Sequence, residues 1–385
     1  MRFAVDAHAI GRNLTGNEVY VRNLLNSLAG LDPGSEFFAY VSVESARDSI
    51  PEGFSCRQVA RGPFLRLGLD LSRKLRQDRP DLLHVQYTAP LGCPVPVVAS
   101  VHDVSFLEHP EYFPRMRSLQ LRWTVRRTVR RAARILTPST FSRDAIARAY
   151  GLDPERITVV PNAVSTSFRP MAREQAASQV KARFGIAAPY VLTVGDVQAR
   201  KNQEGLIRAF AELLRFYPEL PHHLVLVGQE SWHGWRARRA AKRSAVAERI
   251  HFTGFVSDEE LLALYGGCDL FVFPSHYEGF GLPILEAMAC GRAVACSNTT
   301  AMPEVADAAA LLFDPRSTEQ IVLAMRDVLM DAQLRGRLER LGLQRASQFS
   351  WKKTAEQTLQ VYQEVVALRD SAASLAPRTL TVSRR

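Results

Sequence analysis

The chain has 385 residues and a mass of 43.0 kDa, a length that predicts two or three domains. Hydrophobic residues make up 46% and charged residues 23% of the sequence, which excludes a disordered chain and a bundle of membrane spans. The 49 Lys and Arg against 39 Asp and Glu give a net charge of +10. This charge predicts an anionic partner: nucleic acid, a phosphorylated small molecule or an acidic membrane surface.

The five cysteines contain no Cys-x-x-Cys pair, which argues against a disulfide framework and a structural zinc site and indicates a reducing compartment. Near the N-terminus, Asp6 interrupts the apolar residues too early for a signal peptide. Apolar runs elsewhere have only the length of a strand. We therefore expect a cytoplasmic protein in which any membrane contact is peripheral.

In chain order, short β-branched or aliphatic runs alternate with longer helical patterns, which is typical of parallel α/β sheets. In the first half we predict strands at residues 2–6, 37–43, 82–85, 97–101, 135–137 and 158–160. The intervening helices are predicted at residues 19–30, 67–77, 116–133 and 142–149. The second half repeats the pattern, with a helix at residues 202–216 and strands at residues 190–194, 223–227, 250–252, 270–273, 293–295 and 310–313.

A polar, proline-rich stretch at residues 161–188 separates the two halves. We predict an N-terminal domain over residues 1–165 and a C-terminal domain over residues 170–350. A last helix, residues 352–369, is expected to pack back on the first domain, and residues 371–385 are expected to be a disordered tail.

The most informative motif is the segment 274–289, PSHYEGFGLPILEAMA, which follows a buried strand and opens a helix. Gly279 and Gly281 permit a close backbone approach, so the free amides at the start of this helix are expected to face an anion. Glu278 and Glu286 place two carboxylates at different depths of one site, where they can accept hydrogen bonds from sugar or ribose hydroxyls.

This motif resembles the Glu-x7-Glu signature of the retaining glycosyltransferases of family 4, in the mannosyltransferase-like branch that builds bacterial surface polysaccharides. The resemblance implies the GT-B fold, two Rossmann-like domains whose parallel sheets face each other across a cleft. It also implies that Glu278 faces the transferred sugar, that Glu286 binds the nucleotide ribose, and that Gly279, Phe280, Gly281 and Leu282 contact the donor.

Further motifs fit this resemblance. Arg200 and Lys201 stand where the first strand of the second domain turns into a helix, and the resemblance assigns them to the donor diphosphate. His102 and Asp103 end a strand of the first domain. The resemblance implies that His102 lies beside the transferred sugar. Gly16, in the loop after the first strand, and the main chain of Val256, near the nucleobase, complete the expected donor contacts.

We therefore expect a retaining hexosyltransferase that moves a sugar, with mannose favoured, from a GDP- or UDP-sugar to a glycan or lipid-linked acceptor. No Asp-x-Asp triplet occurs, so we expect catalysis without a metal ion or other cofactor. Another GT-B enzyme, an epimerase or a phosphorylase, is the alternative. Two other classes of protein are less favoured. The sequence lacks the glycine fingerprint of a nicotinamide dehydrogenase, and it lacks a recognisable nucleic-acid-binding motif.

Two basic segments of the first domain are candidates for contact with an anionic membrane at the inner face of the plasma membrane. Eight arginines occupy residues 115–134, interspersed with apolar residues. The second segment has leucines at 65, 67, 69 and 71 with Arg61, Arg66, Arg73 and Lys74. An amphipathic helix packed on its own sheet, with solvated arginines, is an equal alternative for the first.

Overall fold

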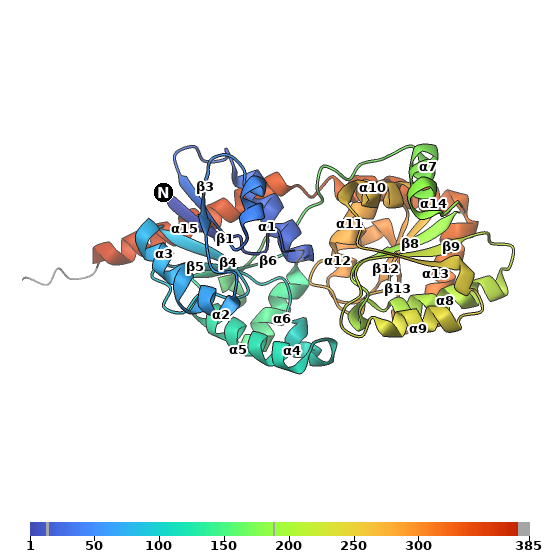
Figure 1. The fold of residues 1–385 in the computed structure, drawn as a ribbon, viewed down its shortest axis with the longest axis horizontal. Coiled ribbons are helices and arrows are strands. Elements are labelled where there is room, and N and C mark those ends of the chain that lie inside the picture. Colours follow the sequence, from blue (N-terminus) through green and yellow to red (C-terminus); the bar gives the residue numbers. More distant parts are fainter. Residues whose placement is uncertain (13–14, 188, 376–385) are drawn as a thin grey trace, which may run out of the picture.

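The computed structural model describes residues 1–12, 15–187 and 189–375, which form two α/β domains joined end to end (Figure 1). Each domain is built on a single parallel sheet flanked by helices. The predicted α/β class follows from the alternation of buried strands with amphipathic helices, since helical crossovers cover both faces of a parallel sheet.

The first sheet has seven strands in the order β3-β2-β1-β4-β5-β6-β7. The strands are β1 (Arg2–Asp6), β2 (Glu36–Val41), β3 (Phe54–Gln58), β4 (Leu82–Gln86), β5 (Val97–Ser100), β6 (Arg134–Thr137) and β7 (Ile157–Val159). In the central strand, Val5 is in register with Ala39 of β2 and His84 of β4. Burial of these strands on both sides explains their nearly continuous apolar sequences.

The helices of this domain are α1 (Thr15–Leu28), α2 (Pro63–Leu65), α3 (Leu71–Asp78), α4 (Ser105–Glu108), α5 (Arg115–Arg131) and α6 (Thr140–Tyr150). A π-turn, η2 (Arg66–Asp70), joins α2 to α3, and short 3-10 turns lie at η1 (Glu44–Ser49), η3 (Pro110–Tyr112) and η4 (Pro154–Arg156). The sequence pattern missed β3, because this edge strand is only partly buried and alternates between polar and apolar residues.

The second sheet has six strands in the order β10-β9-β8-β11-β12-β13. The strands are β8 (Tyr190–Val194), β9 (His223–Val227), β10 (Ile250–Gly254), β11 (Leu270–Phe273), β12 (Val294–Ser297) and β13 (Ala310–Phe313). They coincide closely with the predicted strands, because the central ones, such as β8, β11 and β12, are short runs of mostly apolar residues that are buried in the sheet.

Its helices are α7 (Arg173–Phe184), α8 (Gln203–Phe216), α9 (Trp235–Arg243), α10 (Asp258–Gly267), α11 (Leu282–Ala289), α12 (Met302–Ala306), α13 (Thr318–Met330) and α14 (Ala332–Ala346). The 3-10 turns are η5 (Ala199–Lys201), η6 (Ala247–Arg249) and η7 (Asp307–Ala309). Helix α8 shows why these segments are helical: Leu206, Phe210 and Leu213 recur on one face and are fully buried.

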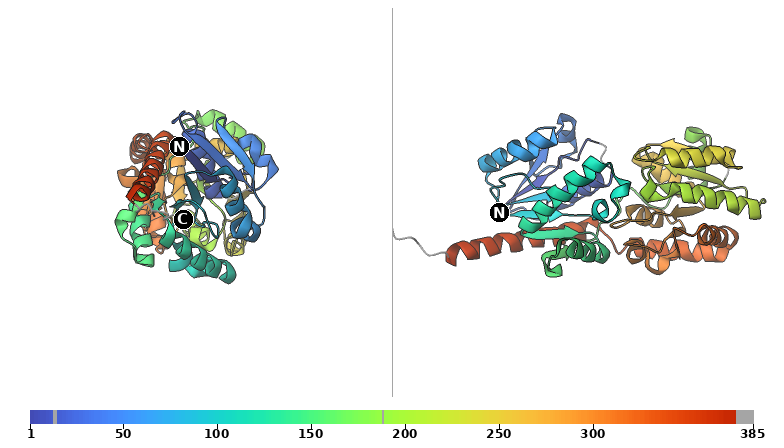
Figure 2. Two further views of the ribbon diagram at one scale, coloured as in Figure 1. Left: turned by 90° about the vertical axis from the view of Figure 1, so that its left-hand side faces the viewer. Right: turned by 90° about the horizontal axis from the view of Figure 1, so that it is seen from below.

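The last helix, α15 (Trp351–Leu375), leaves the second domain and packs on the first, as both views in Figure 2 show. The ring of Tyr362 lies 5.2 Å from that of Phe3 in β1, and the Thr354 hydroxyl donates to the carbonyl oxygen of Pro161 (2.7 Å). Residues 371–375 belong to this helix, so the predicted disordered tail is wrong there. Residues 376–385 lie outside the described residues.

Candidate active site

The carboxyl ends of the strands of both sheets meet where the two domains touch. His102 follows β5 of the first domain, and Gly279 follows β11 of the second. A Cβ atom added to Gly279 would lie only 2.1 Å from the carbonyl oxygen of His102. Only glycine therefore permits this approach, and two segments predicted independently from the sequence are brought into contact.

Three charged side chains form a compact cluster beside this contact. Lys201 Nζ lies 2.7 Å from Glu278 Oε1, and Arg200 Nη1 lies 2.9 Å from Glu278 Oε2. All three side chains have at most 14% of their surface exposed. Burial by itself opposes ionisation of Glu278, but Arg200 and Lys201 outweigh it and lower the pKa of Glu278 to about 2. Glu278 is thus a carboxylate at neutral pH.

The backbone of the second domain holds this cluster in place. Arg200 belongs to the turn η5 and donates to the carbonyl oxygen of Tyr277 (2.5 Å). The backbone N–H of Glu278 donates to the hydroxyl of Thr300 (3.1 Å), in the segment between β12 and α12. Thr300 has a positive φ of 57°, an uncommon conformation for a non-glycine residue. The cluster is therefore positioned by two neighbouring loops.

The first domain grips the same loop through the start of α6. The Ser139 hydroxyl donates to the carbonyl oxygen of Gly279 (2.7 Å), and the Ser142 hydroxyl lies 3.0 Å from the carbonyl oxygens of both Gly279 and His102. Across the same interface, the carboxylate of Glu304 accepts the backbone N–H groups of residues 140 (2.8 Å) and 141 (3.2 Å). A carboxylate at a helix N-terminus is electrostatically favourable.

His102 itself is a neutral, partly buried imidazole. Its Nε2 lies 3.3 Å from Oε1 of Gln86, and the ring of Tyr20 meets it edge-on with centroids 4.6 Å apart. Burial lowers the pKa of His102 to about 4. The histidine therefore presents a polar but uncharged surface at the domain interface.

Glu286 lies one turn inside α11, where its Oε2 accepts a hydrogen bond from the hydroxyl of Tyr265 (2.8 Å). Burial raises the pKa of Glu286 to about 7, although the hydrogen bond from Tyr265 opposes this shift. The two glutamates of the motif thus have very different acidities, Glu278 ionised and Glu286 close to half protonated at neutral pH.

The sequences of two families match the chain. The family described as "Glycosyl transferases group 1" matches residues 178–345, and "Glycosyltransferase Family 4" matches residues 14–168. The O-antigen chain mannosyltransferase B of Escherichia coli is 35% identical over 266 residues, which are 69% of this chain and 69% of that protein. The chain belongs to the family 4 glycosyltransferases. The resemblance stated from the Glu-x7-Glu motif is thereby confirmed.

A serotype-specific mannosyltransferase WbdA of Escherichia coli is 30% identical to this glycosyltransferase over 260 residues. These residues are 66% of the present chain and 31% of WbdA. Sucrose-phosphate synthase from Thermosynechococcus elongatus has a similar structure, with a TM-score of 0.75 at 19% identity, covering 96% of this chain and 100% of that chain. Anabaena Alr3699/HepE, solved with UDP-glucose, gives a TM-score of 0.75 at 20% identity, covering 94% and 99%. These likenesses confirm the predicted GT-B fold.

In this glycosyltransferase, the rest of the motif forms the start of α11. Gly281 is the residue before the helix and has a φ of 112°, which explains a glycine there, and Leu282 is its first residue. Phe280 is buried and packs edge-on against Phe349, with ring centroids 5.9 Å apart. Its side chain thus stabilises the core, which leaves its main chain as the part free to meet a ligand.

The remaining predicted residues lie in more ordinary surroundings. Gly16 is exposed in the first turn of α1, and nothing lies within 4 Å of a Cβ added there, so packing gives no reason for a glycine. Asp103 Oδ1 accepts the backbone N–H (2.9 Å) and the hydroxyl (2.7 Å) of Ser105 and so begins α4. Val256 is buried in the core of the second domain beside α10.

Sequence reasoning missed the residues that clamp the motif from outside it: Ser139, Ser142, Thr300 and Glu304. A signal for the serines was present, because the segment 138–142, PSTFS, follows a buried strand of a parallel sheet, where ligand-facing loops begin. Nothing in the local sequence pairs Glu304 with α6, since the two are joined only by the contact of the domains.

The two basic segments have different outcomes. In α5, Met116 (78% exposed), Leu119 and Trp123 stand in solvent among the arginines, and so does Phe64 (86% exposed) in α2. The second segment needs correction: Arg66 is buried and forms an ion pair with Asp6, and Leu71 is fully buried. Only Leu65 and Leu69 of its leucines are largely exposed, because η2 and α3 turn the others inward.

Among the described residues, no helix combines the length and the apolar composition that crossing a bilayer requires. The same residues contain no group of three or more His, Cys, Asp or Glu side chains placed to hold a metal ion.

Proposed function

We propose that this glycosyltransferase moves a hexose, with mannose favoured, from a GDP- or UDP-sugar to a glycan or lipid-linked acceptor, with retention of configuration and without a metal ion. The observation that carries the proposal is the cluster of Glu278, Lys201 and Arg200, two cations and one carboxylate, buried next to the start of α11. The mannosyltransferase names of its relatives support the choice of sugar.

The cations fit the departing diphosphate. When the anomeric bond breaks, negative charge grows on the phosphate, and preorganised donors stabilise that charge most effectively in a site that excludes water. Lys201 and Arg200 are held by Glu278 and by the backbone before any donor arrives, so little reorganisation is needed. Each charge-assisted contact is expected to contribute roughly 1.5–3 kcal/mol. The backbone amides after Glu278 add further donors.

The two glutamates suit two different sets of hydroxyls. Glu278 is ionised and lies next to the contact between Gly279 and His102, so we assign it to the hydroxyls of the transferred sugar. Glu286 lies one turn inside α11, beside the hydroxyl of Tyr265, and is assigned to the ribose. His102 is neutral and contacts the sugar through its ring or its carbonyl oxygen, without acting as a base.

For the transfer step, we propose front-face attack, in which the acceptor hydroxyl approaches from the side of the leaving phosphate. The new bond forms from the acceptor oxygen to the anomeric carbon, the bond from that carbon to the phosphate oxygen breaks, and a phosphate oxygen takes the hydroxyl proton. Membership of family 4 supports this assignment, which leaves Glu278 to bind the sugar, so we expect the glutamate to affect turnover more than nucleotide affinity.

We also propose that the first domain touches an anionic membrane. The membrane patch, defined as Phe64, Leu65, Leu69, Met116, Leu119 and Trp123, consists of large apolar side chains that are each at least 58% exposed. The arginines of α5 surround its apolar residues, and aromatic and basic side chains together favour the interface of an anionic bilayer. A lipid-linked acceptor would be presented there.

The decisive experiment measures transfer from a panel of nucleotide-sugars, with and without a chelator, and determines the anomeric configuration of the product. We expect GDP-mannose to be the best donor, activity to survive EDTA, and the anomeric configuration to be retained. Loss of activity with EDTA that Mg²⁺ or Mn²⁺ restores would refute the metal-free assignment. An inverted product would refute front-face attack, and turnover of another sugar would correct the donor.

A further inference from the structure

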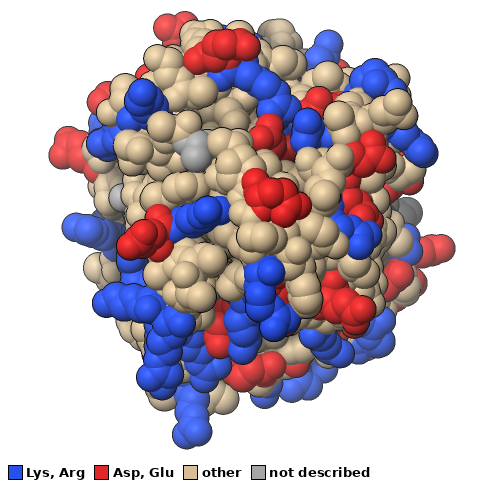
Figure 3. Space-filling model, turned by 90° about the vertical axis from the view of Figure 1, so that its right-hand side faces the viewer, with Lys and Arg blue, Asp and Glu red and all other residues tan. Residues whose placement is uncertain are grey.

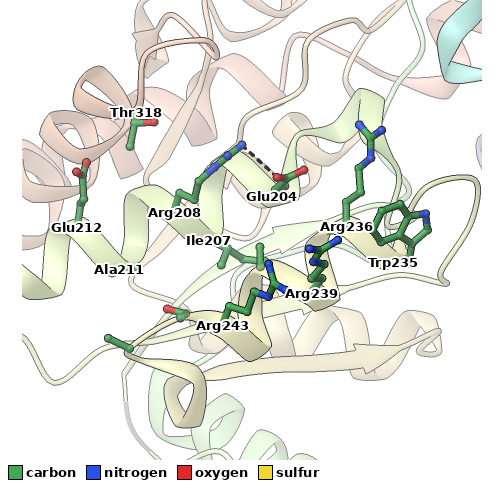
Figure 4. Close-up of a pocket in the computed structure, with 13 residues that line it drawn as sticks. Glu204, Ile207, Arg208, Ala211, Glu212, Trp235, Arg236, Arg239, Arg243 and Thr318 are labelled. Carbon is green, nitrogen blue, oxygen red and sulfur yellow. Dashed lines mark ion pairs between the residues drawn. The ribbon is translucent and has the colours of Figure 1, made fainter.

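A basic groove lies on the outer side of the second domain, away from the contact between Gly279 and His102. It runs between α8 and α9 and has a volume of about 730 Å³ (Figure 4). Ile207, Ala211 and Ala240 provide apolar lining. Around them stand an aromatic side chain, four cations and two carboxylates: Trp235, Arg208, Arg236, Arg239, Arg243, Glu204 and Glu212.

Helix α9 concentrates positive charge on this side of the domain. Its nine residues, WRARRAAKR, include five Arg or Lys and no acidic residue. Ala237 and Ala241 are buried against the domain, and the small size of their side chains lets the helix pack closely while every cation points outward. Trp235 is 49% exposed, and Trp232, just before the helix, is 45% exposed.

Most of these cations have no carboxylate to neutralise them. Arg208 pairs with Glu204 (3.4 Å), and Arg238 pairs with Glu230 (2.6 Å). The other four basic side chains of α9 have no carboxylate within 4.0 Å in the described part of the chain; they are Arg236, Arg239, Lys242 and Arg243. Figure 3 shows Lys and Arg side chains gathered at the lower left of this end of the molecule. Such a surface attracts polyanions.

The groove lies on the same side of the molecule as the membrane patch of the first domain. Figure 1 places α2 and α5 of the first domain and α9 of the second along the lower edge, and the view from below in Figure 2 displays the helices of both domains. Helix α5 also contains no acidic residue. Two basic surfaces, each with exposed tryptophan, therefore point in one general direction from separate domains.

We infer that α9, with Trp232 and Trp235, is a second contact with an anionic membrane, made by the donor-binding domain. The arginines of the groove would bind lipid phosphates, and the two tryptophans would enter the headgroup region, where their amphipathic rings are favoured. This inference rests on the membrane contact in the proposed function. It adds that both domains touch the bilayer, which would fix the direction from which a lipid-linked acceptor reaches Glu278.

The test compares two triple variants of the full chain in co-sedimentation with vesicles of phosphatidylcholine alone or with phosphatidylglycerol added. The groove variant carries Arg236→Gln, Arg239→Gln and Arg243→Gln. The control variant removes the same charge from exposed positions on α7 and α14, on the upper side of the domain in Figure 1: Lys181→Gln, Arg337→Gln and Arg340→Gln. Unfolding temperature and donor turnover in solution are measured for both, to show that each is folded and active.

Each cation close to an anionic surface strengthens binding roughly fivefold, so we expect the groove variant to bind phosphatidylglycerol vesicles at least about tenfold more weakly than the wild type. The control variant should lose much less. Trp235→Ser alone should weaken vesicle binding and leave solution turnover unchanged, and the intrinsic fluorescence of the wild type should shift to the blue on binding.

Three outcomes would overturn the inference, and they are distinguishable. If the wild type binds the vesicles and the groove variant binds equally well, α9 does not touch the membrane, while the membrane patch of the first domain stands. Equal weakening of both triple variants likewise refutes a specific contact and leaves only the general positive charge. If the wild type does not bind at all, both membrane proposals fall, and glycosyl transfer in solution remains untouched.

Discussion

The ends of the strands in the second domain carry charge where they meet the first domain, whereas the strand ends of the first domain carry mostly neutral hydrogen-bonding groups. Lys201, Arg200 and Glu278 follow β8 and β11. On the opposite side, the hydroxyl of Tyr20 lies 2.8 Å from that of Ser100 in a buried network.

That network continues through His84, whose Nε2 lies 2.7 Å from the Ser100 hydroxyl and whose Nδ1 bonds to the hydroxyl of Tyr362. Burial lowers the pKa of His84 to about 3 and raises that of Tyr20 to about 12, so both groups stay neutral. The two sides therefore differ in charge: the second domain carries a buried cluster of two cations and one carboxylate, whereas this network of the first domain is neutral, a contrast that fits the proposed binding of a diphosphate by the second domain.

The largest effect is expected from a substitution in the charged cluster of the second domain. In Lys201→Met, the departing diphosphate loses a preorganised cation, and we expect turnover to fall by about 10²–10³ at saturating donor. Lys353→Met, at an exposed position of α15, is the matched control and should remain within twofold of the wild type. The measurement is the initial rate of transfer for both variants. A Lys201→Met enzyme with full turnover would falsify the assignment of Lys201 to the donor diphosphate.

The next largest effect is expected at the contact between the two domains, where Gly279 meets His102. Ala at position 279 would bring its Cβ 2.1 Å from a backbone carbonyl oxygen, which cannot give way as a flexible side chain would, so the domains must separate. We expect Gly279→Ala to lower kcat/KM about 100-fold with little change in unfolding temperature. Gly336→Ala on α14, where only the end of the Arg340 side chain lies within 4 Å of the added Cβ, should keep the wild-type kcat/KM and be at least as stable. Similar activity of the two variants would show that the contact is dispensable.

A smaller effect is expected at the clamp between α6 and α12. Glu304→Gln keeps the shape of the side chain but removes the charge that the helix N-terminus favours. Because Glu304 is exposed, we expect only a three- to tenfold loss of turnover, with donor affinity unchanged. Steady-state kinetics measure the split between kcat and KM, and Glu319→Gln on α13 serves as control. An increase in KM alone would contradict a role in holding the domains together.

The smallest effect is expected from the difference in pKa between Glu278 and Glu286. Burial raises the pKa of Glu286 to about 7, above its ordinary value of 4.5, so its contribution to stability is full below about pH 4.5 and is lost as the pH rises through 7. Glu286→Gln should remove this loss and be more stable than the wild type at pH 8 by roughly 1–3 kcal/mol, while donor affinity falls. Thermal unfolding from pH 5 to 8 measures it, and identical pH profiles would disprove the shift.

Much of the fold was readable from the sequence, because each strand of a doubly covered parallel sheet must be apolar along its whole length. The six strands of the second sheet were all predicted, the central strands β11 and β12 for this reason. The edge strand β3 was not predicted, because it is only partly buried and polar residues interrupt its apolar ones. Helix α15 was predicted through about residue 369, and the structure extends it to Leu375.

The candidate site was predicted in part. Glu278, Lys201 and Arg200 were identified because they stand in loops between a buried strand and a helix and because their motifs resemble those of a known family. Arg66 was wrongly included in a basic segment expected to contact a membrane. Its burial depends on Asp6, which lies 60 positions earlier and is joined to it only by the fold. Residue type and spacing contain no information about such distant partners.

The sequence by itself determined which segments form strands and helices, and which chemical groups stand at the strand ends, because burial and hydrogen bonding act on each segment locally. The tertiary structure alone decided that Gly279 meets His102, that Glu304 reaches α6, and that Glu278 and Glu286 differ so widely in acidity. These depend on which groups the two domains bring within a few ångströms of each other, where both desolvation and charge act most strongly.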